Sequence, residues 1–209
     1  MDRKGILLVV SGFSGAGKGT LMKELVSRYD NYALSISATT RSPREGEVDG
    51  REYFFRTKEE FEQMIADEAL IEHACYVGNY YGTPRAYVEE QLALGRDVIL
   101  EIEIQGALQI KKRFPDTLLL FVSTPDAETL KNRLIGRGTE SLDVVEKRLS
   151  RASEEAEGIE NYDYFIINDD LDTCVTQVHQ IIQGEHSRVS RNLELINTIK
   201  KDISKFQKG

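Results

Sequence analysis

Nine consecutive residues near the start of the chain have the composition of a loop that binds phosphate groups. Glycines let a backbone turn tightly and approach phosphate oxygens without interference from Cβ atoms. The apolar run Ile6–Val10 before the loop predicts a buried strand, and Leu21–Val26 after it has helical composition. Backbone N–H groups and the positive end of that helix would then face a polyphosphate, with Lys18 reaching its terminal phosphates. The loop consists of Gly12, Phe13, Ser14, Gly15, Ala16, Gly17, Lys18, Gly19 and Thr20.

One position departs from the strict pattern of such a loop. Gly19 stands directly after the lysine, where the strict pattern has Ser or Thr, and Thr20 follows one residue later. The order Lys-Gly-Thr in this place resembles many nucleoside monophosphate kinases. The alternative is an ordinary glycine-rich turn between a strand and a helix, and the number of matching features within one window counts against it.

A second group of residues is a candidate for binding another phosphate. Arg41 and Arg44 are three positions apart, flanked by hydroxyl side chains and stiffened by Pro43, so they could clamp a phosphate with paired hydrogen bonds. Tyr53 and the pair Tyr80–Tyr81 offer further hydroxyl donors. Taken alone, two such arginines would be read as solvated loop residues, and packing inside a lobe is an open role for one of the tyrosines.

The elements that must position these groups alternate between strand and helix. This alternation predicts an α/β fold with a mostly parallel central sheet covered by helices on both faces. Between residues 41 and 94 the pattern changes to short strands, two helices and a turn at 78–79, which indicates an inserted lobe. After Gly184 the chain is basic, with apolar residues spaced for one helical face. Core strands are expected over 5–10, 34–37, 97–104, 117–122 and 164–168, and the first helix over 18–28.

Two carboxylates near the end of the expected strand 97–104 are candidates for work at the same site. Glu101 and Glu103 are two positions apart, so on a strand both side chains would point to the same face. Ligands bind at the carboxyl ends of the strands in parallel sheets of this kind. Two charges inside an otherwise apolar run are costly to bury without partners, which argues against a purely structural role.

Composition limits the class of protein. The chain has 209 residues, 40% of them hydrophobic and 30% charged, which suits one globular domain with small inserted lobes. Its net charge of −8 argues against sequence-independent binding to nucleic acid. Cys75 and Cys174 are far apart and the histidines lack metal-ligand spacing, so we expect a cytoplasmic protein without disulfides or zinc. No run predicts a membrane span or a secretion signal, and the oligomeric state stays open.

Several motifs that occur together and in order resemble the guanylate kinase family. Besides the phosphate loop they are Thr39–Glu47, Gly78–Thr83, Gly136–Gly138 and Ile167–Asp170. The resemblance extends from about Gly5 to Gln183. It implies the P-loop fold of nucleoside monophosphate kinases and the transfer of a phosphoryl group from ATP to GMP, with dGMP expected as a further acceptor and Mg²⁺ as cofactor. It also implies three parts, which are a core of residues 1–36, 95–130 and 158–209, a GMP-binding lobe of about 37–94, and a mobile lid of about 131–157.

Carried over by position, the resemblance assigns an acceptor site within the lobe. A carboxylate there would favour guanine, because guanine presents adjacent N1–H and N2–H₂ donors whereas adenine has a bare N1. Glu101 and Glu103 stand where the family has paired aspartates. We expect Glu101 near magnesium-bound water or Arg41, and Glu103 towards the GMP. The resemblance places Arg41, Arg44, Tyr53 and Tyr81 on the GMP phosphate and Ser37, Glu72 and Thr83 on the base.

The resemblance also assigns the donor site and the lid. Arg133, Arg137 and Arg148 would bring positive charge to the transferring group, and Asn168 would lie near the adenine of ATP. With Lys18 and Arg41, the arginines Arg137 and Arg148 are the expected catalytic residues. Arg133 could equally form an exposed i,i+4 pair with another side chain of its own helix. Because Gly19 has no hydroxyl, we expect phosphates and water to hold most of the Mg²⁺ coordination.

Two other functions remain open from the sequence. A scaffold module related to guanylate kinases could bind phosphorylated peptides without catalysis, and the intact glycines, Lys18 and the lid arginines argue against it. A kinase for adenylate or another base is suggested by Lys-Gly-Thr, and Glu72 with the tyrosine motif argues against that alternative.

Overall fold

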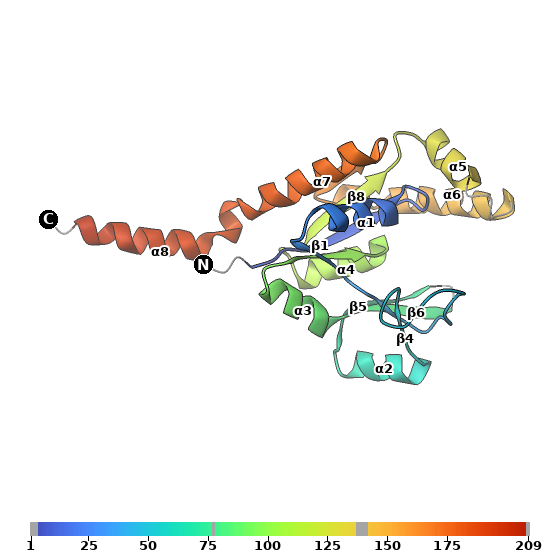
Figure 1. Cartoon of the computed structure of the whole chain (residues 1–209), viewed down its shortest axis with the longest axis horizontal. Helices are drawn as coiled ribbons and strands as arrows, with labels where there is room; N and C mark the ends of the chain where they lie inside the picture. Colours follow the sequence, from blue (N-terminus) through green and yellow to red (C-terminus); the bar gives the residue numbers. More distant parts are fainter. Residues whose placement is uncertain (1–3, 77, 137–141, 208–209) are drawn as a thin grey trace.

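The computed structural model of the chain describes residues 4–76, 78–136 and 142–207. Its centre is a five-stranded sheet in which all neighbouring strands are parallel (Figure 1). The order of the strands is β2-β7-β1-β8-β9. This sheet confirms the predicted α/β class. Its strands are β1 (Leu7–Gly12), β2 (Tyr32–Leu34), β7 (Asp97–Glu101), β8 (Leu118–Ser123) and β9 (Tyr164–Ile167).

Helices cover both faces of the central sheet, because side chains alternate along its middle strand. Leu8 and Val10 of β1 pack with α1 and α7, whereas Val9 between them packs with α3 and α4 on the other face. All three side chains are fully buried. The predicted helix over 18–28 is confirmed. The four covering helices are α1 (Lys18–Arg28), α3 (Arg85–Ala93), α4 (Ile104–Arg113) and α7 (Leu171–His186).

A smaller four-stranded sheet lies beside the central one and carries α2 on its outer side (Figure 1). β6 pairs antiparallel with both β3 and β5, and β3 pairs parallel with β4. α2 begins with a capping box formed by Thr57 and Glu60, and its Phe61 is fully buried against Ala38 and Leu70. The elements of this unit are β3 (Ala38–Thr39), β4 (Phe54–Phe55), α2 (Lys58–Ala66), β5 (Leu70–Tyr76) and β6 (Asn79–Pro84).

A pair of helices, α5 (Ala127–Gly136) and α6 (Leu142–Ala156), lies at the end of the molecule opposite the chain termini (Figure 1). Leu130 and Leu134 of α5 pack against Val145 and Ala152 of α6. Phe13 of the loop after β1 packs against this cluster, so the helix pair is attached directly to that loop.

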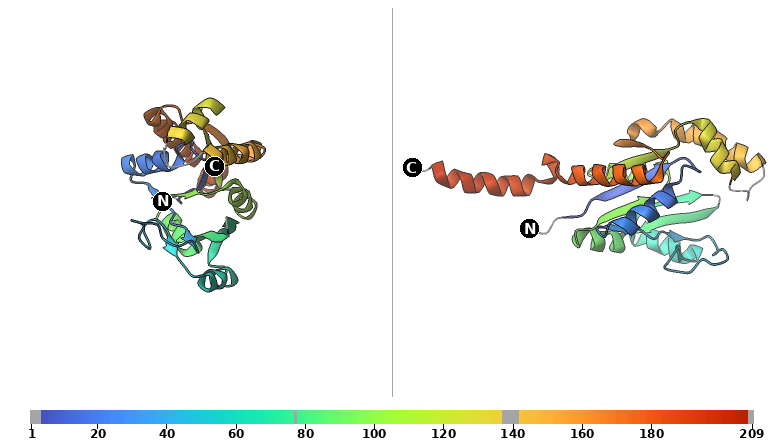
Figure 2. Two further views of the ribbon diagram at one scale, coloured as in Figure 1. Left: turned by 90° about the vertical axis from the view of Figure 1, so that its right-hand side faces the viewer. Right: turned by 45° about the horizontal axis from the view of Figure 1, so that its top comes forward.

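The last helix, α8 (Leu193–Ser204), points away from the rest of the molecule (Figure 1 and the right view of Figure 2). Most of its apolar side chains are exposed, namely Leu193, Leu195, Ile199 and Ile203, whereas Ile196 is half-buried. The amphipathic helix expected after Gly184 is therefore present. Among the residues that the structure describes, no helix combines the length and the apolar character that crossing a membrane would require.

The predicted and observed strands differ most at three places, and the first strand is also shifted by two residues, from the predicted 5–10 to Leu7–Gly12. Of the strand expected over 34–37 only Leu34 belongs to a strand, the last residue of β2, because the chain crosses over 35–37 from the central sheet to β3 of the smaller one. The expected turn at 78–79 leads directly into β6, which the sequence analysis missed. The strand expected to reach Ile104 ends at Glu101. Beyond that point the Ile102 carbonyl accepts a hydrogen bond from Ser11 Oγ at 2.7 Å, and α4 begins at Ile104.

Candidate active site

The loop between β1 and α1 has a backbone shape that favours glycine, with positive φ at Gly12, Gly15 and Gly17. Gly17 is the N-cap of α1 with φ of 87° and ψ of 17°, a left-handed conformation that other residues adopt at a cost. A Cβ atom on Gly17 would lie 2.6 Å from Nδ2 of Asn168, and one on Gly12 would lie 2.1 Å from the carbonyl oxygen of Val122. The first turn of α1 contains no acidic residue, so its N-terminus can attract an anion.

Lys18 lies across this loop. Its Nζ donates hydrogen bonds to the carbonyl oxygens of Gly12 at 2.7 Å and Phe13 at 3.2 Å. The ammonium group is therefore held at the same turn from which α1 directs its N-terminus. Together they form a concentration of positive charge at the carboxyl end of β1.

Three side chains from later in the chain converge on the loop. Nδ2 of Asn168, which is buried, donates to the carbonyl oxygen of Ala16 at 2.8 Å. Arg133 donates through Nη1 to the carbonyl oxygen of Asn168 at 2.9 Å, and Arg148 donates to Oγ of Ser14 at 3.0 Å. Two of the predicted lid arginines thus contact the loop or its support. The third, Arg137, lies outside the described residues.

The predicted clamp for a second phosphate lies on the long loop between β3 and β4. The Arg41 guanidinium lies 5.3 Å from the ring centroid of Tyr53, and Tyr53 in turn lies 6.1 Å from Tyr81, measured between ring centroids. Burial raises the pKa of Tyr53, so its hydroxyl stays protonated and can donate a hydrogen bond. The structure brings Arg41 and the two tyrosines together, whereas the Arg44 side chain is exposed.

Glu72 on β5 is a buried carboxylate between the smaller sheet and α4. Its side chain accepts a hydrogen bond from Thr83 Oγ1 at 2.8 Å, and the residue is only 6% exposed. A Cβ atom on Gly106 would lie 3.1 Å from Oε2 of Glu72, so the carboxylate packs closely against the first turn of α4. Burial raises the pKa of Glu72 to about 6, although the hydrogen bonds from Thr83 oppose this change. Ser37, half-buried, lies just before β3.

The two carboxylates expected on one face of a strand lie on different elements, so that prediction was wrong. Glu101 ends β7 beside Val10, and a Cβ atom on Gly19 would lie 3.8 Å from its Oε2. Desolvation raises the pKa of Glu101, and the positive charge of Lys18 opposes this effect. Glu103 is instead the N-cap of α4, because the strand stops two residues earlier.

The sequence analysis missed a group of charged residues that surrounds Glu103. Arg151 of α6 lies 3.5 Å from Glu103, between Nη2 and Oε2, and 3.0 Å from Glu155, between Nε and Oε1. Desolvation and the charge of Glu103 raise the pKa of Glu155, and Arg151 opposes them. The i,i+4 spacing of Arg151 and Glu155 was visible in the sequence, but nothing there connected the pair with Glu103.

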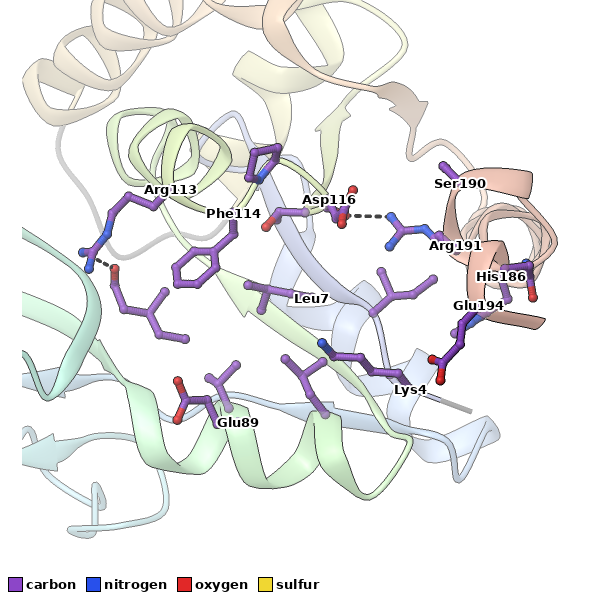
Figure 3. A pocket seen from close by; sticks show the side chains of 18 of the residues that line it. Lys4, Leu7, Glu89, Arg113, Phe114, Asp116, His186, Ser190, Arg191 and Glu194 are labelled. Atoms are coloured by element: carbon purple, nitrogen blue, oxygen red, sulfur yellow. Dashed lines mark hydrogen bonds between the residues drawn. The ribbon is translucent and has the colours of Figure 1, made fainter. Parts of the chain in front are cut away.

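A cavity of about 920 Å³ lies at the other end of the central sheet from the phosphate loop (Figure 3). Leu7, where β1 begins, and Thr117, just before β8, line this cavity, so it adjoins the amino ends of the strands. Arg113 beside it donates to the carbonyl oxygen of Ile71 at 2.9 Å. Because open parallel sheets bind ligands at the carboxyl ends of their strands, we place the candidate active site at the Gly12 end.

The chain is also similar to known proteins of one family. The model of the family described as guanylate kinase matches residues 4–185. A guanylate kinase of Bacillus anthracis is 53% identical over 191 residues, which cover 91% of this chain and 93% of that protein. One of Streptococcus agalactiae serotype III (strain NEM316) is 48% identical over 98% of this chain and 99% of its own length. The crystal structure of guanylate kinase from Anaplasma phagocytophilum superposes with a TM-score of 0.73, at 30% identity, covering 90% of this chain and 89% of that one.

Proposed function

The chain belongs to the guanylate kinase family and transfers a phosphoryl group from ATP to GMP, and we propose how its own residues divide this reaction. One observation carries the proposal. The short segment from Glu101 to Gly106 touches both candidate sites, because Glu101 lies beside Gly19 of the phosphate loop and Gly106 lies against Glu72. Two sites joined by so short a segment suit a donor and an acceptor nucleotide whose phosphates must meet.

The donor side is the loop Gly12–Thr20 with the arginines that approach it. Phosphoryl transfer is catalysed mainly by positioning and by positive charge on the transferring group, so Lys18 and the N-terminus of α1 would bind the ATP phosphates. Arg148, already at Ser14, and Arg133 would add charge from the helix pair α5–α6. Arg137 has the same proposed role. Asn168 would support the loop beneath the adenine of ATP, since its side chain holds the Ala16 carbonyl.

The acceptor side is the smaller sheet, which we assign to the GMP-binding lobe of residues 37–94. Arg41, Arg44, Tyr53 and Tyr81 would bind the GMP phosphate. The buried Glu72, with Thr83 and Ser37, would accept the paired N–H donors of guanine. Adenine would leave the Glu72 carboxylate facing a lone pair, and unpaired buried groups are how a site rejects a similar base. The same site leaves dGMP as an expected acceptor.

The residues at the donor side fit a magnesium ion. Mg²⁺ prefers oxygen ligands, keeps several waters and usually binds through phosphates and one or two carboxylates. Glu101 supplies one carboxylate, whose oxygens would lie 3.8 and 3.9 Å from a Cβ atom on Gly19. Gly19 itself has no side chain to fill the space between them. Glu103 lies two residues further along the chain. Bound there, Mg²⁺ would neutralise charge on the phosphate oxygens. We therefore propose that Glu101 holds the ion through water, and that the GMP phosphate itself is the nucleophile, so no protein base is needed.

Removing one cation from each side tests this division of roles. Lys18→Ala should weaken ATP binding and turnover while the GMP Kd stays within about twofold of the wild-type value. Arg41→Ala should weaken GMP binding while the ATP Kd stays within about twofold. Lys58→Ala is a matched control, because Lys58 is an exposed cation of the same lobe that pairs only with Glu62 among the ion pairs of the described residues. If Arg41→Ala left the GMP Kd unchanged, the phosphate assignment within the lobe would be wrong.

A further inference from the structure

Glu47, in the loop between β3 and β4, joins the two arginines assigned to the GMP phosphate. Both of its carboxylate oxygens lie 2.9 Å from Nη2 of Arg41. Its Oε2 also accepts a hydrogen bond from the backbone N–H of Arg44 at 2.7 Å. One carboxylate therefore holds the side chain of one arginine and the backbone of the other.

The loop that Glu47 closes is a compact turn. The backbone N–H of Glu47 donates to the carbonyl oxygen of Arg44 at 3.1 Å, and Gly46 has a φ of 83° that reverses the chain. Arg44 and Glu47 are therefore joined by two hydrogen bonds, and each residue donates one of them through its backbone N–H. The N–H of Arg44 lowers the pKa of the Glu47 carboxyl, and Arg41 lowers it further, so Glu47 is ionised at neutral pH.

Several neighbours besides Glu47 hold the guanidinium of Arg41. It lies 5.3 Å from the ring centroid of Tyr53 and 5.8 Å from that of Phe55. Its Nη1 donates to the carbonyl oxygen of Ser42 at 2.7 Å. The side chains of Arg41 and Glu47 are only 16% and 17% exposed. These contacts within the protein fix a long flexible side chain, which reduces the entropy that it would lose on binding a phosphate.

We propose that Glu47 is a positioning residue for the acceptor phosphate, which keeps Arg41 and the turn at Arg44 in their binding arrangement without touching the nucleotide. The inference rests on the proposed assignment of Arg41 to the GMP phosphate. The alternative is that Glu47 blocks Arg41 and must leave when phosphate binds. The hydrogen bond with the Arg44 backbone favours positioning, because displacing Glu47 would also open the turn.

Binding of GMP and of guanosine, measured by calorimetry or by competition, separates these roles. Glu47→Ala should raise the GMP Kd by about tenfold, the factor that corresponds to fixing one long side chain. The guanosine Kd should stay within about twofold, because guanosine has no phosphate for Arg41 to bind. Glu47→Gln keeps an acceptor for the Arg44 N–H and should have a smaller effect. Glu45→Ala, at an exposed position of the same loop, removes the same charge and should leave both constants unchanged.

The inference is overturned if Glu47→Ala leaves the GMP Kd unchanged or lowers it. It is also overturned if the guanosine Kd rises equally, because that would indicate general loss of structure in the lobe. Added to Arg41→Ala, the Glu47→Ala change should raise the GMP Kd by less than it does alone, because only the part of its effect that passes through the turn at Arg44 remains. If Arg41→Ala alone had no effect, the phosphate assignment would fail together with the inference, whereas failure of Glu47→Ala beside an effective Arg41→Ala would overturn the inference alone.

Discussion

The substitution Glu72→Gln tests whether the buried carboxylate costs stability in the free protein. Burial raises the pKa of Glu72 from an ordinary value of 4.5 to about 6, so the folded state disfavours the ionised form. Because the folded state favours the protonated carboxyl, Glu72 makes its full contribution to the free energy of unfolding below pH 4.5. This contribution is lost as the pH rises through about 6. The difference between the two pKa values corresponds to about 2 kcal/mol of unfolding free energy.

Urea unfolding of both proteins across this pH range measures the effect. The amide of glutamine does not titrate, so any fixed cost of placing it beside Thr83 is the same at every pH. The free energy of unfolding of Glu72→Gln minus that of the wild type should increase by about 2 kcal/mol from pH 4 to pH 8. Most of that increase should fall between pH 4.5 and about 6. A difference that stays constant with pH would refute the assignment of a raised pKa to Glu72.

The same substitution tests how the base is read. The carboxylate can accept both guanine donors, whereas the amide offers one acceptor and one donor. We expect kcat/KM for GMP to fall about 10- to 150-fold, which corresponds to the loss of one hydrogen bond to a charged group. The ratio of GMP to AMP activity should narrow, because the amide could donate to the bare N1 of adenine. An unchanged ratio, in a variant whose circular dichroism matches the wild type, would show that Glu72 does not read the base.

Four further changes probe the rest of the site and the fold. Lys18→Ala should lower kcat about 10²- to 10³-fold in a protein that still folds, measured by coupled ADP release. A near-normal kcat would refute the phosphate-loop assignment. Arg148→Ala should lower kcat far more than it raises the GMP Kd, since Arg148 contacts Ser14 of the phosphate loop; a change confined to the Kd would contradict this. Gly17→Ala should lower the unfolding free energy by about 1–2 kcal/mol or more, and equal urea midpoints would refute the strain. Removing residues 193–209 should change the unfolding free energy by less than about 0.5 kcal/mol and leave kcat intact, and a larger loss would show that the projecting α8 supports the core.

Local patterns predicted the parts of the fold that depend on neighbouring residues. The helix over 18–28 was predicted from its composition and spacing and is observed at Lys18–Arg28, and the left-handed Gly17 before it sets its first residue. The strand β6 was missed because Gly78 and Asn79 resemble a turn, and its pairing with β3 and β5 depends on segments distant in sequence. Pairing of that kind leaves no local signal.

At the candidate site, the positions of Glu101, Glu103 and Glu47 likewise depend on contacts that local sequence patterns do not reveal. The apolar run that contains Glu101 and Glu103 predicted a continuing strand, but the pairing of β7 with β1 ends at Val10 and Glu101, and α4 already begins at Ile104. Glu47 lay inside the motif that carried the family resemblance, yet its contact with Arg41 follows from the turn at Gly46. Residue types at a motif could be predicted, whereas their partners depend on how the loops fold.

The reaction itself is tested most directly by ADP release from ATP with GMP, AMP, UMP and CMP offered separately as acceptors. We predict rapid turnover with GMP and a kcat/KM at least about 10²-fold lower with AMP, because adenine leaves the buried Glu72 unpaired. The Arg41→Ala variant should lose most of its affinity for GMP and keep its affinity for ATP. Equal turnover with AMP, or no phosphoryl transfer to GMP by the well-folded wild type, would contradict the account.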